Sequence, residues 1–203
     1  YNQVLGLSGT LAGTAILIAL LFDAVSDPLA GSLSDNWQSR WGRRHPFMYA
    51  SALPLGIAFF FLFSPPEGLS EFSLFLWLTV TVVLTRGAMT LYHVPHIALG
   101  AELSEDYDER TQIVSYRYFL GFAGYLVAYY LGFGVFFKDT AEFPRGQFNV
   151  DAYAPYAFVL AVTMVVTIVW SGWGTHHRIP HLPLARVKSE AGKLTVLNVI
   201  TRM

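Results

Sequence analysis

Two aspartates, Asp23 and Asp27, interrupt a long apolar segment and have the chemistry to bind a cation or carry a proton. They are four residues apart with Ser26 between them, so in a helix all three side chains share one face. Two neighbouring carboxylates repel each other unless a cation or a proton lies with them. Carboxylate and hydroxyl oxygens suit a hard cation such as Na⁺. The alternative is a structural salt bridge from this face to Arg86 or Arg117.

A second polar face runs along the apolar segment from residue 72 to residue 100. Spacings of four and three residues place Arg86, Thr90 and His93 on one helix face. A histidine can exchange a proton near neutral pH, although a hydrogen-bonded interior histidine is the alternative for His93. A charge at the centre of a membrane helix costs roughly 2.5–3.5 kcal/mol, so Arg86 and Arg117 are expected to face a cavity or a partner. From their depths, Asp23, Asp27, His93 and Arg117 are expected to lie in one layer.

A cluster of arginines follows the first apolar segment. Asp35 ends that segment, and Arg40, Arg43 and Arg44 come after it in a polar joint. One interpretation is that these arginines only signal membrane topology. The sharper hypothesis is a latch of ion pairs at the cytoplasmic face, formed by these four residues. The acidic run over residues 102–109 is expected to be a solvated loop.

Five apolar segments must position these side chains. Each is close to or above the roughly 20 residues needed to cross the hydrocarbon of a bilayer. Because lipid cannot satisfy backbone N–H and C=O groups, each should be a helix. The predicted fold class is therefore an all-α membrane protein with five transmembrane helices in residues 1–175 and a polar tail over residues 176–203. The segments are residues 4–31, 47–64, 72–100, 113–137 and 153–174.

Composition excludes several other classes of protein. The chain of 203 residues is 54% hydrophobic and 13% charged, with a mean hydropathy of +0.44. That charge content is about half the value for soluble domains, which argues against a soluble enzyme or a disordered tail. A net charge of -1 gives no basic field for nucleic acid. The chain has no cysteine, so disulfides and thiolate chemistry are excluded.

Orientation follows from lysine and arginine. If the segments alternate, Lys138 and Arg145 fall on one side and nine basic residues fall on the other, which should be the cytoplasm. The chain then starts outside, which predicts a missing upstream helix; six helices would make half of many transporters. We therefore expect the chain to be a fragment. The nine basic residues are Arg40, Arg43, Arg44, Arg110, Arg178, Arg186, Lys188, Lys193 and Arg202.

Four motifs resemble one transporter family. They read FDAVSDPLAG (residues 22–31), SRWGRRHP (39–46), YHVPH (92–96) and DERTQIVSYR (108–117). With them the sequence resembles the major facilitator superfamily, and within it the glycoside–pentoside–hexuronide:cation symporters, over about residues 1–183. The resemblance implies the N-terminal half of such a transporter without its first helix, and residues 176–203 as the start of the central cytoplasmic loop.

The resemblance also implies roles for the residues on the first polar face. The family couples inward transport of a solute, often a sugar, to Na⁺, Li⁺ or H⁺. Two acids of its second helix bind the cation and match Asp23 and Asp27. Ser26 stands where a family member has asparagine, and Thr90 matches a threonine of the fourth helix.

Three further residues concern the solute. One of them matches the family pattern and two depart from it. Arg117 matches an arginine of the fifth helix. His93 stands where an acid helps to bind sugar and cation, so the site holds less negative charge, which favours H⁺ over Na⁺. Arg86 has no charged counterpart in a galactoside carrier of the family, which favours an anionic solute.

The predicted function is therefore cation-coupled symport of a sugar, glycoside or sugar acid by alternating access. The protein is predicted to be no enzyme, to need no cofactor beyond the coupling ion H⁺ or Na⁺, and to span the inner (cytoplasmic) membrane several times. Its expected partners are the small-molecule solute, the bilayer and the missing C-terminal half of the same polypeptide, with no nucleic acid. The alternatives are a non-transporting scaffold or a channel, and a membrane prenyltransferase-type enzyme. Such an enzyme needs two aspartate-rich motifs, and this sequence has one.

Overall fold

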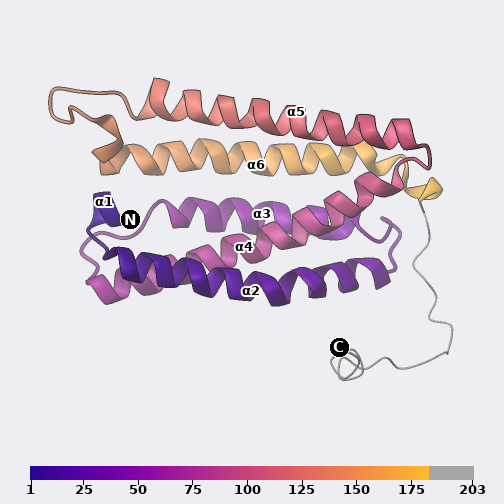
Figure 1. Cartoon of the computed structure of the whole chain (residues 1–203), viewed down its shortest axis with the longest axis horizontal. Helices are drawn as coiled ribbons and strands as arrows, with labels where there is room; N and C mark the ends of the chain where they lie inside the picture. Colours follow the sequence, from indigo (N-terminus) through magenta and orange to yellow (C-terminus); the bar gives the residue numbers. More distant parts are fainter. Residues whose placement is uncertain (183–203) are drawn as a thin grey trace.

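The computed structural model describes residues 1–182, and every regular element in this range is helical. Five of its helices are long and apolar enough to cross a membrane, which confirms the predicted all-α class with five membrane helices (Figure 1). The α-helices are α1 (Asn2–Leu5), α2 (Gly9–Asn36), α3 (His45–Leu62), α4 (Glu71–Glu102), α5 (Tyr107–Leu131) and α6 (Tyr153–His176). A π-helical turn (Gly132–Phe136) continues α5, and short 3-10 turns occupy Gly146–Phe148, Val150–Ala152 and Ile179–His181.

Polar caps, which a hydropathy pattern does not reveal, set the helix ends. The first long helix begins at Gly9 instead of residue 4, because the Ser8 hydroxyl accepts the N–H of Leu11. It continues to Asn36, so Asp35 lies in its last turn. The helix expected from residue 113 begins at Tyr107, because the Asp106 carboxylate accepts two N–H groups of the first turn.

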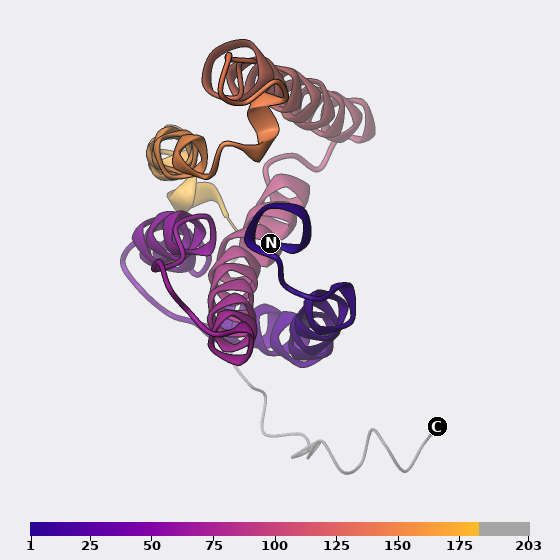
Figure 2. The ribbon, with the colours of Figure 1, turned by 90° about the vertical axis from the view of Figure 1, so that its left-hand side faces the viewer.

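Helix α4 lies at the centre of the arrangement. It packs against α2 on one side and α3 on the other, as Figure 2 shows, and α3 packs in turn against α6. Helix α5 stands apart from this group and contacts it near its two ends. One end meets α4, and at the other the Tyr156 hydroxyl on α6 donates to the Ala128 carbonyl at 3.0 Å. The candidate residues on α2 and α4 are therefore brought together directly, whereas those on α5 are not.

Small residues allow α3 and α6 to approach closely. A Cβ atom added at Gly56 would lie 2.7 Å from a methyl carbon of Val165 and 3.3 Å from the Ala161 carbonyl oxygen. At the end of this interface the buried His45 ring contacts the Thr175 hydroxyl, with 3.0 Å between Nε2 and Oγ1. In lipid the hydrophobic effect does not drive helices together, and small interfacial residues instead allow close van der Waals packing.

Gly56→Ala should therefore destabilise the full-length protein. The added methyl group meets a stiff β-branched side chain and a backbone carbonyl, and overpacking of this kind costs about 1–3 kcal/mol. Thermal unfolding in detergent measures the loss. Gly13→Ala is the control, because the added carbon meets no described atom within 4 Å apart from those of its chain neighbours and of its own helix backbone. Equal unfolding temperatures for the two variants would contradict the close α3–α6 contact.

One end of the bundle collects the connections that the sequence places in the cytoplasm. The ends of α2, α4 and α6 and the starts of α3 and α5 lie together there (Figure 1). After α6, Arg178 Nη2 donates to the Leu103 carbonyl at 3.0 Å, which holds the first residues of the predicted tail at the same end. The predicted loop beyond residue 182, with its basic residues Arg186, Lys188, Lys193 and Arg202, lies outside the described residues.

Candidate functional site

Two of the predicted cation residues, Asp27 and Thr90, meet between α2 and α4. The Thr90 hydroxyl donates a hydrogen bond to Asp27 Oδ1 at 2.7 Å. Gly87 permits this approach, because a Cβ at this position would lie 3.1 Å from the Phe22 ring of α2. Thr90 is buried and Asp27 is exposed. The Asp27 carboxylate thus lies on an open helix face with one oxygen held by the Thr90 hydroxyl.

Asp23, one turn earlier on α2, forms an ion pair with Arg86 of α4. Both Nε and Nη2 of the guanidinium contact Asp23 Oδ2. The Asp23 side chain is 13% exposed and that of Arg86 is 44% exposed. The salt bridge considered from the sequence is therefore present at Asp23, with Arg86 as the partner. Asp27 forms no ion pair within residues 1–182.

Several oxygens on this stretch of α2 lack a hydrogen-bond donor. Asp23 Oδ1 and Ser26 Oγ are buried and have no partner in the described structure. Pro28 lies inside α2 and has no N–H, so the Ala24 carbonyl loses its helical donor. Each unpaired buried polar group costs about 1–3 kcal/mol. A small hard cation or a proton could bind to these oxygens and supply the partner that they lack.

His93 lines a cavity rather than the carboxylate face. The cavity has a volume of about 470 Å³ and is formed by α3, α4 and α6. Its lining is mostly apolar, with Arg86 and His93 among the few polar side chains. No hydrogen bond among the described residues joins His93 to Asp23 or Asp27. The volume lies within the range of about 300–1,000 Å³ that small-molecule sites occupy.

Arg117 is not brought together with the other candidates. It lies on α5, where its guanidinium carbon is 5.4 Å from the centre of the Tyr118 ring. No described ion pair or hydrogen bond links Arg117 to Asp23, Asp27 or His93. Of the four residues expected in one layer, only Asp23 and Asp27 lie together, because His93 faces another cavity and α5 meets α4 only near one end.

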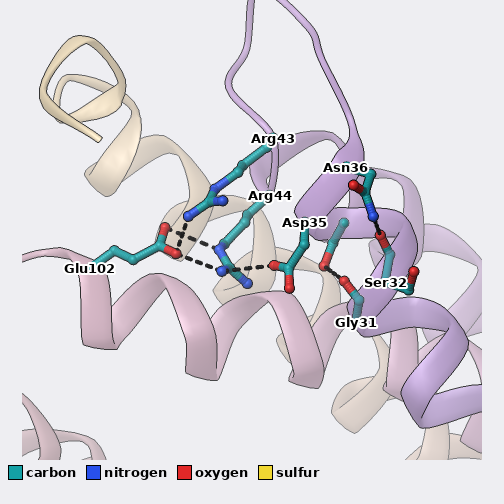
Figure 3. A network of polar contacts seen from close by, with 8 residues as sticks. Gly31, Ser32, Asp35, Asn36, Arg43, Arg44 and Glu102 are labelled. Carbon is teal, nitrogen blue, oxygen red and sulfur yellow. Dashed lines mark hydrogen bonds and ion pairs between the residues drawn. The ribbon is translucent and has the colours of Figure 1, made fainter. Parts of the chain in front are cut away.

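The end of the bundle carries a network of ion pairs, shown in Figure 3, around Glu102, the last residue of α4. Arg44 donates to both carboxylate oxygens of Glu102, at 2.5 Å and 3.1 Å, and its Nη2 lies 2.9 Å from Asp35 Oδ1. Arg43 binds the same Glu102 carboxylate. Three of the four predicted latch residues are therefore joined. The fourth, Arg40, instead lies over the Trp41 ring at 5.7 Å.

Sequence reasoning missed Glu102, which was expected in a solvated loop. The signal for its role was electrostatic. The arginines between α2 and α3 need a counter-charge at the same end of the bundle. Glu102 is the first acidic residue after the polar face of α4. Hydropathy alone could not separate it from the acidic residues that follow.

Comparison with known proteins gives a consistent set of similarities. A family model described as MFS/sugar transport protein matches residues 1–203. The chain is 34% identical over 124 residues to the inner membrane symporter YicJ of Escherichia coli, covering 61% of this chain and 27% of that protein. It is 28% identical over 175 residues to the uncharacterized symporter sll1374 of Synechocystis sp., covering 84% and 31%. It is 26% identical over 168 residues to the glucuronide carrier protein homolog of Escherichia coli, covering 82% and 35%.

The chain therefore spans about a third of the length of these curated relatives. Two of the three are named symporters and the third is named a carrier. These names denote membrane transport, which agrees with the five helices long enough to cross a membrane.

Proposed function

Because the chain belongs to the MFS/sugar transport protein family, we propose that it is part of a cation-coupled symporter for a sugar, a glycoside or a sugar acid. One observation carries the proposal. Between two membrane helices Asp27 is held by Thr90, and next to it Asp23 Oδ1 and Ser26 Oγ are buried without a donor. Charged and unpaired polar groups inside a membrane segment are costly, and they commonly mark the pathway of a substrate or an ion.

The coupling cation would bind on the α2 face. Asp27 supplies the accessible charge, and the Thr90 hydroxyl fixes the direction in which that carboxylate points. Asp23 and Ser26 contribute the neighbouring unpaired oxygens. No bond in the solute is made or broken, so the protein acts as a carrier and not as an enzyme.

The solute would bind in and beside the cavity on the other face of α4. Arg86 and His93 are among the residues that line it, and they can donate hydrogen bonds to hydroxyl or carboxylate oxygens. Arg117 on α5 would face the solute from another side of the pathway. Since Arg86 contacts Asp23 on α2 and lines this cavity on α4, it connects the cation and the solute sites.

Transport would follow alternating access, in which two halves of the protein rock around a central site. The described helices would form one side of that site, and the rest of the same polypeptide would form the other. The protein would then lie in the cytoplasmic membrane, as the name of the inner membrane symporter states for that relative. The ion network at Glu102 would act as a latch that holds one of the two states.

We expect H⁺ to be preferred over Na⁺ as the coupling ion. Na⁺ binding requires several oxygens around a surplus of negative charge, and in the described, solute-free state Arg86 neutralises one of the two aspartates. With His93 in place of a third acid, the neighbouring solute cavity also adds no negative charge from its described lining. A proton needs only one acceptor, so a site with one free carboxylate suits it better.

Uptake into proteoliposomes that contain the full-length protein tests this proposal. Counterflow with a panel of sugars and sugar acids first identifies a transported solute. An imposed inward proton gradient should then drive its accumulation several-fold more strongly than an imposed Na⁺ gradient at equal pH. Protein-free liposomes under the same gradients are the control.

Two results would count against the proposal in different ways. Absence of uptake of every sugar and sugar acid would refute the carrier function. Uptake driven by Na⁺ with no response to a proton gradient would keep the symport and correct the ion, leaving His93 as a solute ligand or a packing residue.

A further inference from the structure

The Arg86 side chain contacts Asp23 on α2 and also borders the cavity formed by α3, α4 and α6. Its Nε and Nη2 atoms bind Asp23 Oδ2 on the side of α2. Its side chain is nevertheless 44% exposed and forms part of the cavity wall with His93. The guanidinium is therefore held by Asp23 and remains accessible from the cavity. Arg86 is paired and open at the same time.

The cavity offers an incoming anion one fixed charge. Among the described residues that line it, Arg86 is the only side chain with a permanent charge, and most of the others are apolar. The polar remainder includes Thr85, Tyr92 and Thr167, which can donate hydrogen bonds to sugar hydroxyls. A carboxylate that enters this space finds no other permanent counter-charge in the described lining, and a charge without a counter-charge is costly away from water.

We propose that Arg86 exchanges partners during transport: a carboxylate of the solute replaces Asp23 on the guanidinium, and this releases Asp23 to bind the coupling cation. The inference rests on the proposed function and adds the solute class, a sugar acid, and the link between solute and cation. A planar guanidinium suits this exchange, because it binds carboxylates through paired N–H donors. A neutral sugar has no group that can displace Asp23.

The exchange explains why cation and solute would bind together. Without solute, Arg86 acts as a tethered cation that competes for Asp23. With the solute anion on Arg86, Asp23 presents a free carboxylate beside Asp27, with Ser26 Oγ and its own Oδ1 already unpaired. Neither charge is left alone in the membrane in the final state. Linkage makes the effect reciprocal, so the cation tightens solute binding by the same factor, typically about 5–150-fold.

Equilibrium binding to the purified full-length protein tests the exchange without any gradient. The probes are glucuronate and uncharged glucose. Asp23→Asn removes the internal competitor, so it should bind glucuronate at least about tenfold more tightly than the wild type, with no further gain from added Na⁺ or lower pH. Arg86→Gln should bind glucuronate at least about tenfold more weakly and lose the preference for glucuronate over glucose.

Two further variants separate the exchange from a general effect of lost charge. Asp27→Asn removes an acid from the same helix face but leaves the Asp23–Arg86 pair, so it should not tighten glucuronate binding. The double variant Asp23→Asn/Arg86→Gln removes both charges of the pair, and it should bind glucuronate and glucose equally. If an unpaired Arg86 prevents folding of Asp23→Asn, the wild type tests the exchange instead, because added cation should tighten its binding of glucuronate and not of glucose.

The outcomes separate this inference from the proposed function. Unchanged or weaker glucuronate binding by Asp23→Asn, together with proton- or Na⁺-driven uptake by the wild type, would overturn the exchange and leave the symporter standing. The expected binding pattern without any driven uptake would support the exchange and overturn the symporter. Failure of the wild type to bind glucuronate would overturn the assignment of a sugar acid to Arg86.

Discussion

Full-length protein with Asp27→Asn should lose cation-driven accumulation of its solute down to the level of protein-free liposomes. Asparagine has the size of aspartate and can still accept the Thr90 hydrogen bond, which measures 2.7 Å to Asp27 Oδ1. It has no charge, so the cation loses its accessible ligand. Downhill exchange of solute should partly survive, because the cavity beside Arg86 is unchanged. Gradient-driven uptake and counterflow, measured in the same proteoliposomes, separate the two effects.

The variant should also fold, which distinguishes a cation ligand from a structural acid. Asp27 is exposed and has no ion-pair partner among residues 1–182, so no buried arginine is orphaned by the change. Asp151→Asn makes the same chemical change at an exposed position near the start of α6 and should leave accumulation unchanged. Normal accumulation by Asp27→Asn would rule out the α2 face as the cation site.

Removing the Thr90 hydroxyl should have a smaller effect than removing the Asp27 charge. A single hydrogen bond to a charged group is worth about 1.5–3 kcal/mol, so a variant such as Thr90→Val would weaken cation binding without abolishing it. The order of the two effects follows from the geometry, because the carboxylate binds the cation and the hydroxyl only orients it. Thr90 is thus a positioning residue for Asp27.

The number and type of the helices could be predicted because lipid leaves the backbone little choice. A run of about 20 apolar residues has to be helical in a bilayer, and the sequence contains five such runs. The ends were harder, since they depend on single capping side chains such as Ser8 and Asp106. The packing of α5 was not predictable, because its distance from α2 depends on contacts between helices far apart in the sequence.

The candidate site divides in the same way. The shared face of Asp23, Ser26 and Asp27 follows from helical spacing within one segment. The choice of Arg86 over Arg117 as the partner of Asp23 does not, because it depends on α4 packing beside α2 while α5 lies elsewhere. Spacing within a helix can be deduced from the sequence, whereas pairing between helices needs their relative positions.

Glu102 is the clearest case of an interaction between helices that could not be predicted from the sequence. It was grouped with acidic loop residues, yet it ends α4 and accepts from two arginines of the joint after α2 (Figure 3). The Arg44 side chain is only 7% exposed, so its charge depends on this carboxylate and on the more exposed Asp35. Glu102 thereby ties the end of α4 to the start of α3.

Glu102→Gln should consequently destabilise the full-length protein by about 3 kcal/mol, the low end of the range for breaking a buried ion pair. The amide cannot neutralise Arg43 and Arg44. Arg44 would keep only Asp35, and Arg43 would keep no ion-pair partner among the described residues. Thermal unfolding in detergent measures the loss of stability. Arg40→Gln is the contrast at the same end of the bundle, and it should change stability by no more than about 0.5 kcal/mol, as exposed substitutions usually do.

The same pair of variants decides whether the network is a latch or only a structural tie. A latch stabilises one transport state, so Glu102→Gln should shift the protein toward the opposite state as well as lower its stability. Labelling of a single cysteine at position 39, in the joint between α2 and α3, reports accessibility at this end of the bundle. Its rate should rise in Glu102→Gln and stay constant in Arg40→Gln. A stability loss with an unchanged labelling rate would mean that Glu102 holds α3 and α4 together without governing transport, because the two states would then lose the same free energy.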